Sequence, residues 1–368
     1  MVQLQVKILN KDGKEDVIYC VGKTCPPTEF IWEVFNTKVT FKKEIEVYKT
    51  IAPTLNEFGR QYGLDNVMSF FAKCLGARIS LDPKSDVVDK DAVLLLENLL
   101  VKGYSTGDRF VGFNFDATKF LLGDLATLHA VPLAFRLKKP EEYEMKIRPY
   151  LNKDFTFKFS KEMTSDYINS IQKILATVRE CVPFLSNVEE AILKLVSMSP
   201  ENTPNEKELF ATFTHNDYWV NNTMIKYEDG KPVSNRIVDF QIIEHHSLAH
   251  DVVFFLYSSV ELEVLQSHLD ELFQYYYDKF IGILKQFDCD IKEFTFEAFM
   301  EECGHITRQE QFGHIMIMLP GIMTLKEKAK ELSELKEGDI VAQEKSLHEN
   351  CLKKLRFLLL DLEKRGWM

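Results

Sequence analysis

The segment from residue 214 to 241 constrains the fold of this chain more than any other feature. It reads THNDYWVNNTMIKYEDGKPVSNRIVDFQ and places Asp217 and Asn222 in an H-x-D-x-x-x-x-N motif. Asp229-Gly230 stands between two strand-like runs, which predicts a hairpin. The second run ends in Asp239, so the hairpin should bring Asp239 back beside Asn222.

The chemistry of these side chains suits the transfer of a phosphoryl group. Asn222 and Asp239 offer an amide and a carboxylate oxygen, the hard ligands that bind Mg²⁺ when phosphates and waters supply the rest. Asp217 then remains free to orient a hydroxyl group and accept its proton. The motif alone fixes few positions, but the hairpin and the I-V-D-F run make it specific. Alternatively, Asp217 caps a turn, Asn222 is a turn residue and Asp239 is a surface carboxylate after a strand.

The N-terminal part of the chain offers complementary groups for a nucleotide. Lys23 follows a strand-like run and is a candidate for binding the α- and β-phosphates. Glu44 on the next predicted helix is its candidate partner, with Glu46 as the rival. The simpler alternative is that Lys23 is a surface lysine and that Glu44 and Glu46 are solvated helix residues. Glu97 and Leu99 follow a buried apolar run where the two halves should meet, and backbone groups there could bind adenine; an ordinary connector is the alternative.

Length and charge narrow the class of protein. The 368 residues suffice for two lobes that share a cleft. The net charge of −11 makes nucleic acid and anionic membranes poor partners, and we expect neither. Seven scattered cysteines indicate neither a disulfide framework nor a zinc module. Since no signal peptide and no apolar run long enough to span a membrane is recognised, we expect a cytoplasmic protein, and no obligate protein partner is evident.

Hydrophobic periodicity predicts an α+β chain with a small sheet lobe and a larger helical lobe. We expect a half-buried strand over residues 2–9, a turn at Asp12-Gly13 and a second strand that ends before Lys23. Further strands are predicted over 75–81 and 92–96. Helices are predicted over 37–50, from 118 onward, and over 165–180, 187–198, 261–287 and 346–362, with a loop over 199–207. The predicted domains are a nucleotide-binding lobe over 1–98 and a catalytic and substrate-binding lobe over 99–368.

Several motifs resemble the ecdysteroid-kinase-like (CHK-kinase-like) family, which is related to choline kinases and aminoglycoside phosphotransferases. The resemblance covers nearly the whole chain, and the paired W-V-N-N and V-D-F-Q motifs are its most specific part. The matching segments are His215-Asn-Asp-Tyr-Trp-Val-Asn-Asn222, Ile237-Val-Asp-Phe-Gln241, Phe41-Lys-Lys-Glu44 with Tyr48, Leu94-Leu-Leu-Glu-Asn-Leu99, Leu125-Ala-Thr-Leu-His-Ala130 and Leu248-Ala-His-Asp251. The F-x-x-E pattern favours Glu44 over Glu46 as the partner of Lys23.

This resemblance implies a protein-kinase-like two-lobed fold, with ATP and magnesium as cofactors. It implies a small-molecule hydroxyl substrate such as an ecdysteroid or a xenobiotic alcohol, although an acidic cleft could equally accept a cationic alcohol such as choline. Asp217 is implied as the catalytic base, and Asn222 with Asp239 as magnesium ligands. His215 is implied as a structural support of the catalytic loop, and Asp251 as a buried carboxylate that steadies it.

Two positions depart from the family pattern. Members usually carry a strand and a G-E-N-like nucleotide-binding loop before the strand seen here at residues 2–9. Because Met1 abuts that strand, we expect a small lobe that lacks its first strand and glycine-rich loop. Asn216 replaces the usual glycine between the motif histidine and aspartate. The first departure keeps a second hypothesis open, a non-catalytic pseudokinase or truncated isoform that binds a small lipophilic ligand.

Two other classes fit the residues less well. A protein kinase normally has lysine two residues after its catalytic aspartate, where this chain has Trp219, and Asp239-Phe240 is followed by Gln241 rather than glycine. His246 and His250 stand four residues apart and could hold zinc on one helix face, yet no H-E-x-x-H occurs. Exposed or capping histidines are the simpler interpretation.

Overall fold

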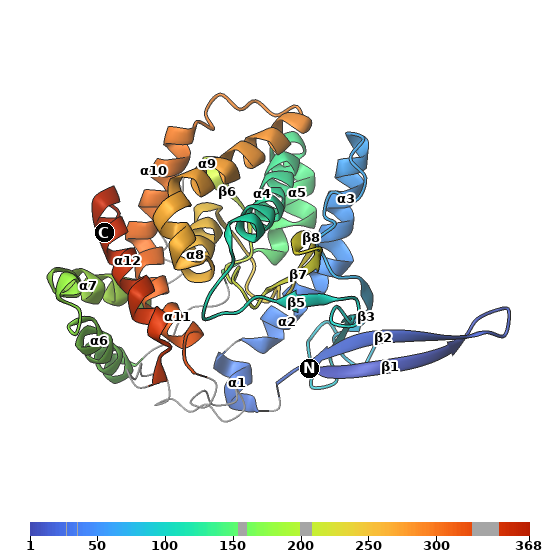
Figure 1. Cartoon of the computed structure of the whole chain (residues 1–368). Coiled ribbons are helices and arrows are strands. Elements are labelled where there is room, and N and C mark those ends of the chain that lie inside the picture. The colour runs from blue at the N-terminus through green and yellow to red at the C-terminus, as the bar shows by residue number, and fades with distance from the viewer. Residues whose placement is uncertain (27, 35, 154–159, 199–207, 326–345) are drawn as a thin grey trace.

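The computed structural model describes residues 1–26, 28–34, 36–153, 160–198, 208–325 and 346–368. A small lobe built on a four-stranded sheet lies beside a larger, mainly helical lobe (Figure 1), which confirms the predicted α+β, two-lobed architecture. The sheet lies within residues 2–97, just before the predicted lobe boundary at residue 98. The predicted loop over 199–207 lies outside the described residues.

The small lobe is an antiparallel sheet with the strand order β1-β2-β4-β3. Its strands are β1 (Val2–Leu9), β2 (Glu15–Thr24), β3 (Cys74–Arg78) and β4 (Val93–Glu97). The predicted turn at Asp12-Gly13 closes the β1–β2 hairpin, and Gly13 has a φ of 73°, which favours glycine. Lys23 lies inside β2 and not past it, because β2 continues to Thr24 while pairing with β4.

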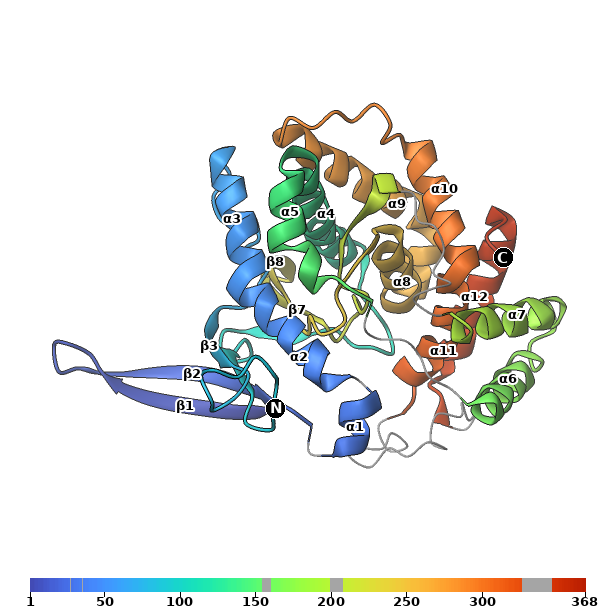
Figure 2. The same ribbon diagram turned by 180° about the vertical axis from the view of Figure 1, so that it is seen from behind.

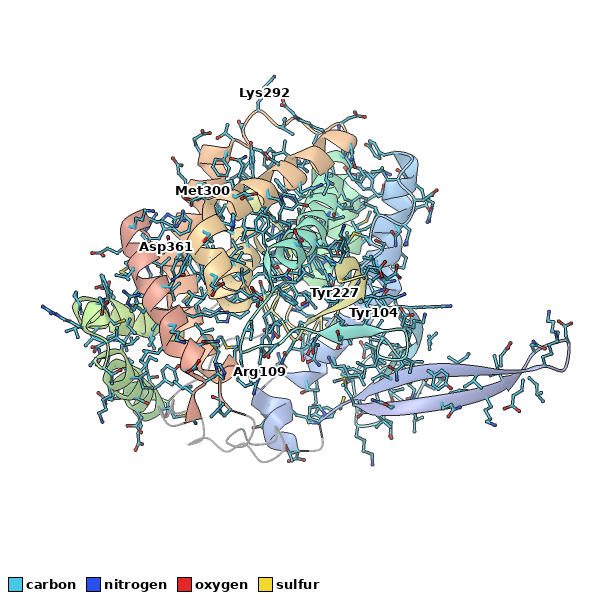
Figure 3. All side chains as sticks on the ribbon, in the orientation of Figure 1. Tyr104, Arg109, Tyr227, Lys292, Met300 and Asp361 are labelled. Carbon is cyan, nitrogen blue, oxygen red and sulfur yellow. The ribbon has the colours of Figure 1, made fainter. Side chains whose placement is uncertain are left out.

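The β1–β2 hairpin projects from the body of the molecule (Figure 1), and the prediction that β1 is half-buried is wrong. Every residue of β1 is exposed, including the apolar Val2, Leu4, Val6 and Ile8. Side chains of β1 and of the first half of β2 point into solvent, whereas those of the body fill the space between its helices (Figure 3). Alternation predicts a strand, but burying one of its faces also requires a packing partner. β4 pairs only with the last part of β2, so most of the hairpin has none there.

A long helical stretch follows the hairpin and carries Glu44. α1 (Glu29–Val34) leads into α2 (Thr37–Glu46), which a π-helical turn, η1 (Val47–Ile51), joins to α3 (Ala52–Gln61). The sequence predicts helix only as far as residue 50, whereas the helical stretch continues to residue 61. Pro53 lies in the first turn of α3, where a missing N–H is tolerated because the wider π-helical turn precedes it.

Two small sheets of the large lobe flank the loop that contains the H-x-D-x-x-x-x-N motif. β5 (Tyr104–Thr106), β7 (Thr223–Glu228) and β8 (Lys231–Ile237) form the first, and β6 (Ala211–Thr214) and β9 (Glu244–Ser247) form the second. The predicted Asp229-Gly230 turn joins β7 to β8, with φ values of 50° and 75°. The β7–β8 hairpin brings the residue before Asp239 back beside Asn222 as predicted, because the Val238 N–H donates to the Asn222 carbonyl over 3.0 Å.

Helices pack around these sheets, as the view from behind shows (Figure 2). α4 packs along α9, and 67% of its most apolar window is buried, which makes it a core helix of this lobe. By length and composition α4 is long and apolar enough to cross a membrane, so the expectation that no apolar run is long enough is wrong. The helices are α4 (Phe115–Lys138), α5 (Pro140–Lys146), α6 (Lys161–Leu175), α7 (Leu185–Val196), α8 (Ala249–Ser259), α9 (Leu262–Gln286), α10 (Phe296–Ile306), α11 (Phe312–Ile322) and α12 (Glu349–Arg365), with the π-helical turn η5 (Thr307–Gln311) between α10 and α11.

A polar pair ties the β7–β8 hairpin to α4. Asn235 on β8 donates from Nδ2 to Asp124 Oδ2 over 3.1 Å, while Asn235 Oδ1 is buried without a hydrogen-bond partner among the described residues. Burial raises the pKa of Asp124 to about 6, although Asn235 and Arg236 oppose the shift. Because the folded pKa exceeds the unfolded one, this carboxyl makes the fold less stable as pH rises from about 4 to 6.

Asp124→Asn is therefore expected to raise the free energy of unfolding at pH 7 by about 1–3 kcal/mol. The change removes the buried charge and offers an N–H to Asn235 Oδ1. Urea unfolding at pH 7 and pH 4 checks this, because most of the gain should vanish at pH 4, where the wild-type carboxyl is largely protonated. A less stable variant at pH 7 would contradict the prediction.

Candidate active site

The motif loop (residues 215–222) connects β6 to β7 through a left-handed residue. Asn216 has a φ of 62°, a conformation that glycine and asparagine adopt readily, which explains how asparagine can stand in place of the usual glycine. His215 Nε2 donates to the Val238 carbonyl over 3.0 Å, and His215 Nδ1 accepts the Asp217 N–H over 3.2 Å. Burial lowers the pKa of His215, so the ring stays neutral and supports the loop.

One buried carboxylate holds the backbone of this loop. Asp251, in the first turn of α8, is fully buried. Its oxygens accept the N–H groups of His215 (2.6 Å) and Asn216 (2.7 Å), and His129 Nε2 on α4 lies 3.0 Å away. Burial alone would raise the pKa of Asp251, but the hydrogen bond with His129 and the nearby imidazole of His250 hold it well below its usual range. Asp251 is therefore ionised, and it sets the direction in which the loop leaves β6.

Asp217 and Asn222 contact each other within the loop. Asn222 Nδ2 donates to the Asp217 carbonyl over 2.8 Å and to Asp217 Oδ2 over 2.7 Å. Burial, reinforced by the charge of Asp239, raises the pKa of Asp217 to about 8. A carboxylate with a raised pKa is a stronger base than an ordinary one, which suits a group that takes a proton from a hydroxyl.

Lys23 of the small lobe contacts two carboxylates. Its Nζ lies 2.7 Å from Glu44 Oε2 and 2.7 Å from Asp239 Oδ1. Burial alone would lower the pKa of Lys23, but Asp239 and Glu44 raise it above its usual range, so the lysine is charged. Glu44 is 1% exposed, whereas Asp239 is 41% exposed and open to a ligand. The rival residue, Glu46, instead accepts from Thr50 Oγ1 over 2.6 Å.

Asn222 and Asp239 fit Mg²⁺ by the chemistry of their donor atoms. Asn222 Nδ2 is occupied by Asp217, which leaves Oδ1 as the possible ligand atom. Asp239 contacts Lys23 through Oδ1, and its exposed carboxylate has a second oxygen to offer. Two hard oxygen donors suit Mg²⁺ when phosphates and waters complete its shell. In the part of the chain that the structure describes, no group of three or more His, Cys, Asp or Glu is arranged to hold a metal, so the zinc alternative finds no ligand set there.

The two candidate adenine-binding residues, Glu97 and Leu99, make other contacts. Glu97, at the end of β4, accepts the Lys73 N–H over 2.8 Å and forms an ion pair with Lys102. Leu99 is buried, and its carbonyl accepts the N–H groups of Lys102 and Tyr104 within a turn. Neither residue lines the pocket beside Asp217, and their role in binding adenine stays a prediction.

A pocket of about 370 Å³ opens beside Asp217 and Asp239. Its other lining residues are Lys153, Leu195, Met198, Asn216, Gln241, Ile242, Glu244, His246, His250, Glu310, His314 and Met318. The interpretation of the histidines as exposed or capping is wrong for His246, which is 3% exposed and lies 2.8 Å from Glu310 Oε1.

Sequence reasoning missed Glu310 and His314 because only tertiary packing brings them to the pocket. η5 and α11 carry these residues, and α11 lies close against α7. Gly313 makes this approach possible, since a Cβ at that position would stand 2.3 Å from the Ala191 carbonyl oxygen. A π-helical turn often marks a functional site, but hydrophobic periodicity does not distinguish it from an α-helix.

The fold and the site together define the class of this protein, a kinase-like small-molecule phosphotransferase. The chain belongs to the ecdysteroid kinase-like family, whose model matches residues 1–289. The family resemblance stated from the motifs is thereby confirmed.

Two solved structures are similar to this chain. A spectinomycin phosphotransferase in complex with ADP and spectinomycin has 12% sequence identity and a TM-score of 0.44, with 100% of this chain and 91% of that chain covered. An ethanolamine kinase of Plasmodium vivax has 11% identity and a TM-score of 0.38, with 100% and 82% covered. No curated protein matches the sequence.

Proposed function

We propose that this protein uses ATP and magnesium to phosphorylate a hydroxyl group of a steroid, such as an ecdysteroid, or of a xenobiotic alcohol. The observation that carries the proposal is the position of Lys23 Nζ, 2.7 Å from both Glu44 and Asp239. This contact joins the group proposed to bind phosphates to a group proposed to hold the metal. Asp239 lines the same pocket as the candidate base, Asp217.

Each of these side chains has one task in the proposed reaction. Lys23, held by buried Glu44, neutralises charge on the α- and β-phosphates. Asn222 and Asp239 would hold Mg²⁺, which when bound neutralises charge on the phosphate oxygens. Asp217 accepts a hydrogen bond from the acceptor hydroxyl, orients its oxygen toward the γ-phosphorus and takes its proton. The bond from phosphorus to the acceptor oxygen forms as the bond to the leaving oxygen of ADP breaks.

The pocket beside Asp217 is the proposed acceptor site. Its described lining residues all belong to the large lobe, and none comes from the sheet that carries Lys23. The volume of about 370 Å³ lies in the range of sites for drug-sized ligands. Leu195, Met198 and Met318 give the pocket apolar surface, which supports a lipophilic alcohol as the acceptor.

Thermal unfolding with ATP, in the presence and absence of magnesium, tests the nucleotide site. We expect ATP with magnesium to raise the melting temperature by several degrees, since saturating ligand adds about 2.7 kcal/mol at a hundred times Kd. Asp239→Asn should remove the dependence on magnesium because it weakens one of the two proposed ligands. ADP release with a panel of steroid and xenobiotic alcohols then tests turnover.

The non-catalytic hypothesis predicts different results in the same experiments. A pseudokinase that binds a small lipophilic ligand would be stabilised by a lipophilic alcohol but not by ATP with magnesium. That outcome would contradict the proposed kinase function.

A further inference from the structure

Glu244 is the group in the acceptor pocket that the proposed reaction leaves unused. It begins β9, is 7% exposed and lines the pocket beside Asp217. Within the part of the chain that the structure describes, its carboxylate takes part in no hydrogen bond or ion pair. Burial raises the pKa of this carboxyl to about 7, against the opposing charge of His246. A buried carboxyl without a partner costs free energy, so a ligand that supplies the partner gains that energy on binding.

Two neighbouring ionisable groups of the pocket, Glu310 and His314, are already engaged with protein partners. Glu310 lies 2.8 Å from His246 Nε2, and this pairing lowers the pKa of Glu310 below its usual range although burial opposes it. His314 Nδ1 lies 3.2 Å from Gln311 Oε1. Burial, reinforced by the charge of His250, lowers the pKa of His314 to about 3, so that ring is neutral. Glu244 is therefore the carboxyl of the pocket best placed to receive a group from a ligand.

The sheet register places Glu244 at a fixed position relative to Asp217. Glu244 is paired with Thr214 across the β6–β9 ladder, and the Thr214 hydroxyl donates to the Glu244 carbonyl over 3.1 Å. Asp217 follows Thr214 by three residues, so the Cα atoms of Thr214 and Asp217 are at most about 11 Å apart. Glu244 and Asp217 both line the same pocket, so one rigid ligand of moderate size could contact both carboxyl groups.

Building on the proposed kinase function, we propose that Glu244 determines acceptor specificity by accepting a hydrogen bond from a second hydroxyl group of the acceptor. The preferred substrate is then a mainly apolar, steroid-sized diol, with one hydroxyl at Asp217 and the other at Glu244. In assays above about pH 8 this carboxyl, whose pKa burial raises to about 7, is ionised and only accepts hydrogen bonds. A ketone in place of the second hydroxyl presents only lone pairs to it and leaves the carboxylate without a donor. Leu195, Met198 and Ile242 offer apolar surface to the skeleton between these two ends.

A matched pair of steroids and one isosteric substitution test this proposal. Androstenediol and dehydroepiandrosterone share a skeleton and one hydroxyl group, and they differ in a second hydroxyl against a ketone. We expect the wild-type protein to favour the diol roughly ten- to a hundredfold in kcat/KM, the range of a hydrogen bond to a charged group. Glu244→Gln should bring this ratio close to one, because the amide can accept from the hydroxyl or donate to the ketone.

Glu363→Gln is the matched control, since Glu363 is exposed on α12 outside the pocket, and it should keep the wild-type ratio. Thermal unfolding of each variant with ATP and magnesium verifies the fold and the nucleotide site independently. An unchanged diol preference in Glu244→Gln would overturn the proposal. A preference for choline over both steroids, or no turnover of either steroid by protein that still binds ATP with magnesium, would overturn it and leave the kinase function standing. Loss of ATP binding by the wild-type protein would instead contradict the proposed function itself.

Discussion

Asp217→Asn is expected to lower kcat by about 10²- to 10⁴-fold, the usual contribution of a general base, without weakening the binding of ATP with magnesium. An amide has nearly the shape of a carboxylate but cannot take the proton of the acceptor hydroxyl. Asn222 Nδ2, which now donates to Asp217 Oδ2 over 2.7 Å, could donate equally to an amide oxygen. The loop should therefore keep its conformation while losing its base.

The melting temperature separates this loss of chemistry from a loss of fold. Asp217→Asn removes a carboxyl whose pKa is raised by burial and by the charge of Asp239, so the variant should melt no lower than the wild type. ADP release under saturating acceptor and calorimetry of the same samples measure both effects. Asp290→Asn, at a carboxylate that is 74% exposed, is the control and should change neither. Wild-type turnover in Asp217→Asn would show that another group takes the proton.

Asp251→Asn is expected to lower the free energy of unfolding by about 3–5 kcal/mol at pH 7 and to abolish most activity. Both carboxylate oxygens accept backbone N–H groups of the motif loop, from His215 and Asn216, and Oδ2 also meets His129 Nε2. An amide replaces one of these acceptors with an N–H₂ group. At least one buried donor then loses its partner, and the loop backbone must shift.

The pH dependence of stability tests whether the charge of Asp251 causes the loss of stability in Asp251→Asn. Its folded pKa lies below the unfolded value of about 3.8, so its contribution to stability is present above that pH and is lost as pH falls. The difference in free energy of unfolding between wild type and Asp251→Asn should therefore shrink below about pH 4. Urea unfolding from pH 3 to pH 7 measures this difference. A difference that stays constant over this range would exclude the charge as its source.

The sequence alone predicted the features of this protein that are locally encoded. Both hairpins were predicted correctly from their Asp-Gly turns, which need positive φ at Asp229 and Gly230 in one turn and at Gly13 in the other. Asn222 and Asp239 flank one such hairpin, and their proximity follows from its return. Local patterns were insufficient at β1, because the alternation of apolar and polar residues predicts a half-buried strand but every residue of β1 is exposed. Local patterns were also insufficient near residue 50, where the predicted helix ends but the helical stretch continues through a π-helical turn into α3.

Only the tertiary structure decided which distant groups share one site. Lys23 meets Asp239 across 216 positions of sequence, and the burial of Glu44 and Asp251 follows from the packing of whole helices. The acceptor pocket shows this most clearly, since Glu244 and Glu310 come from elements that pack together only in the finished fold. Short-range patterns determine strands, turns and the order of the motif residues, because those depend on a few neighbouring backbone angles. The partner, burial and pKa of each ionisable side chain depend on residues far away in the chain, so only the fold makes Glu244 a buried carboxyl that no described residue hydrogen-bonds.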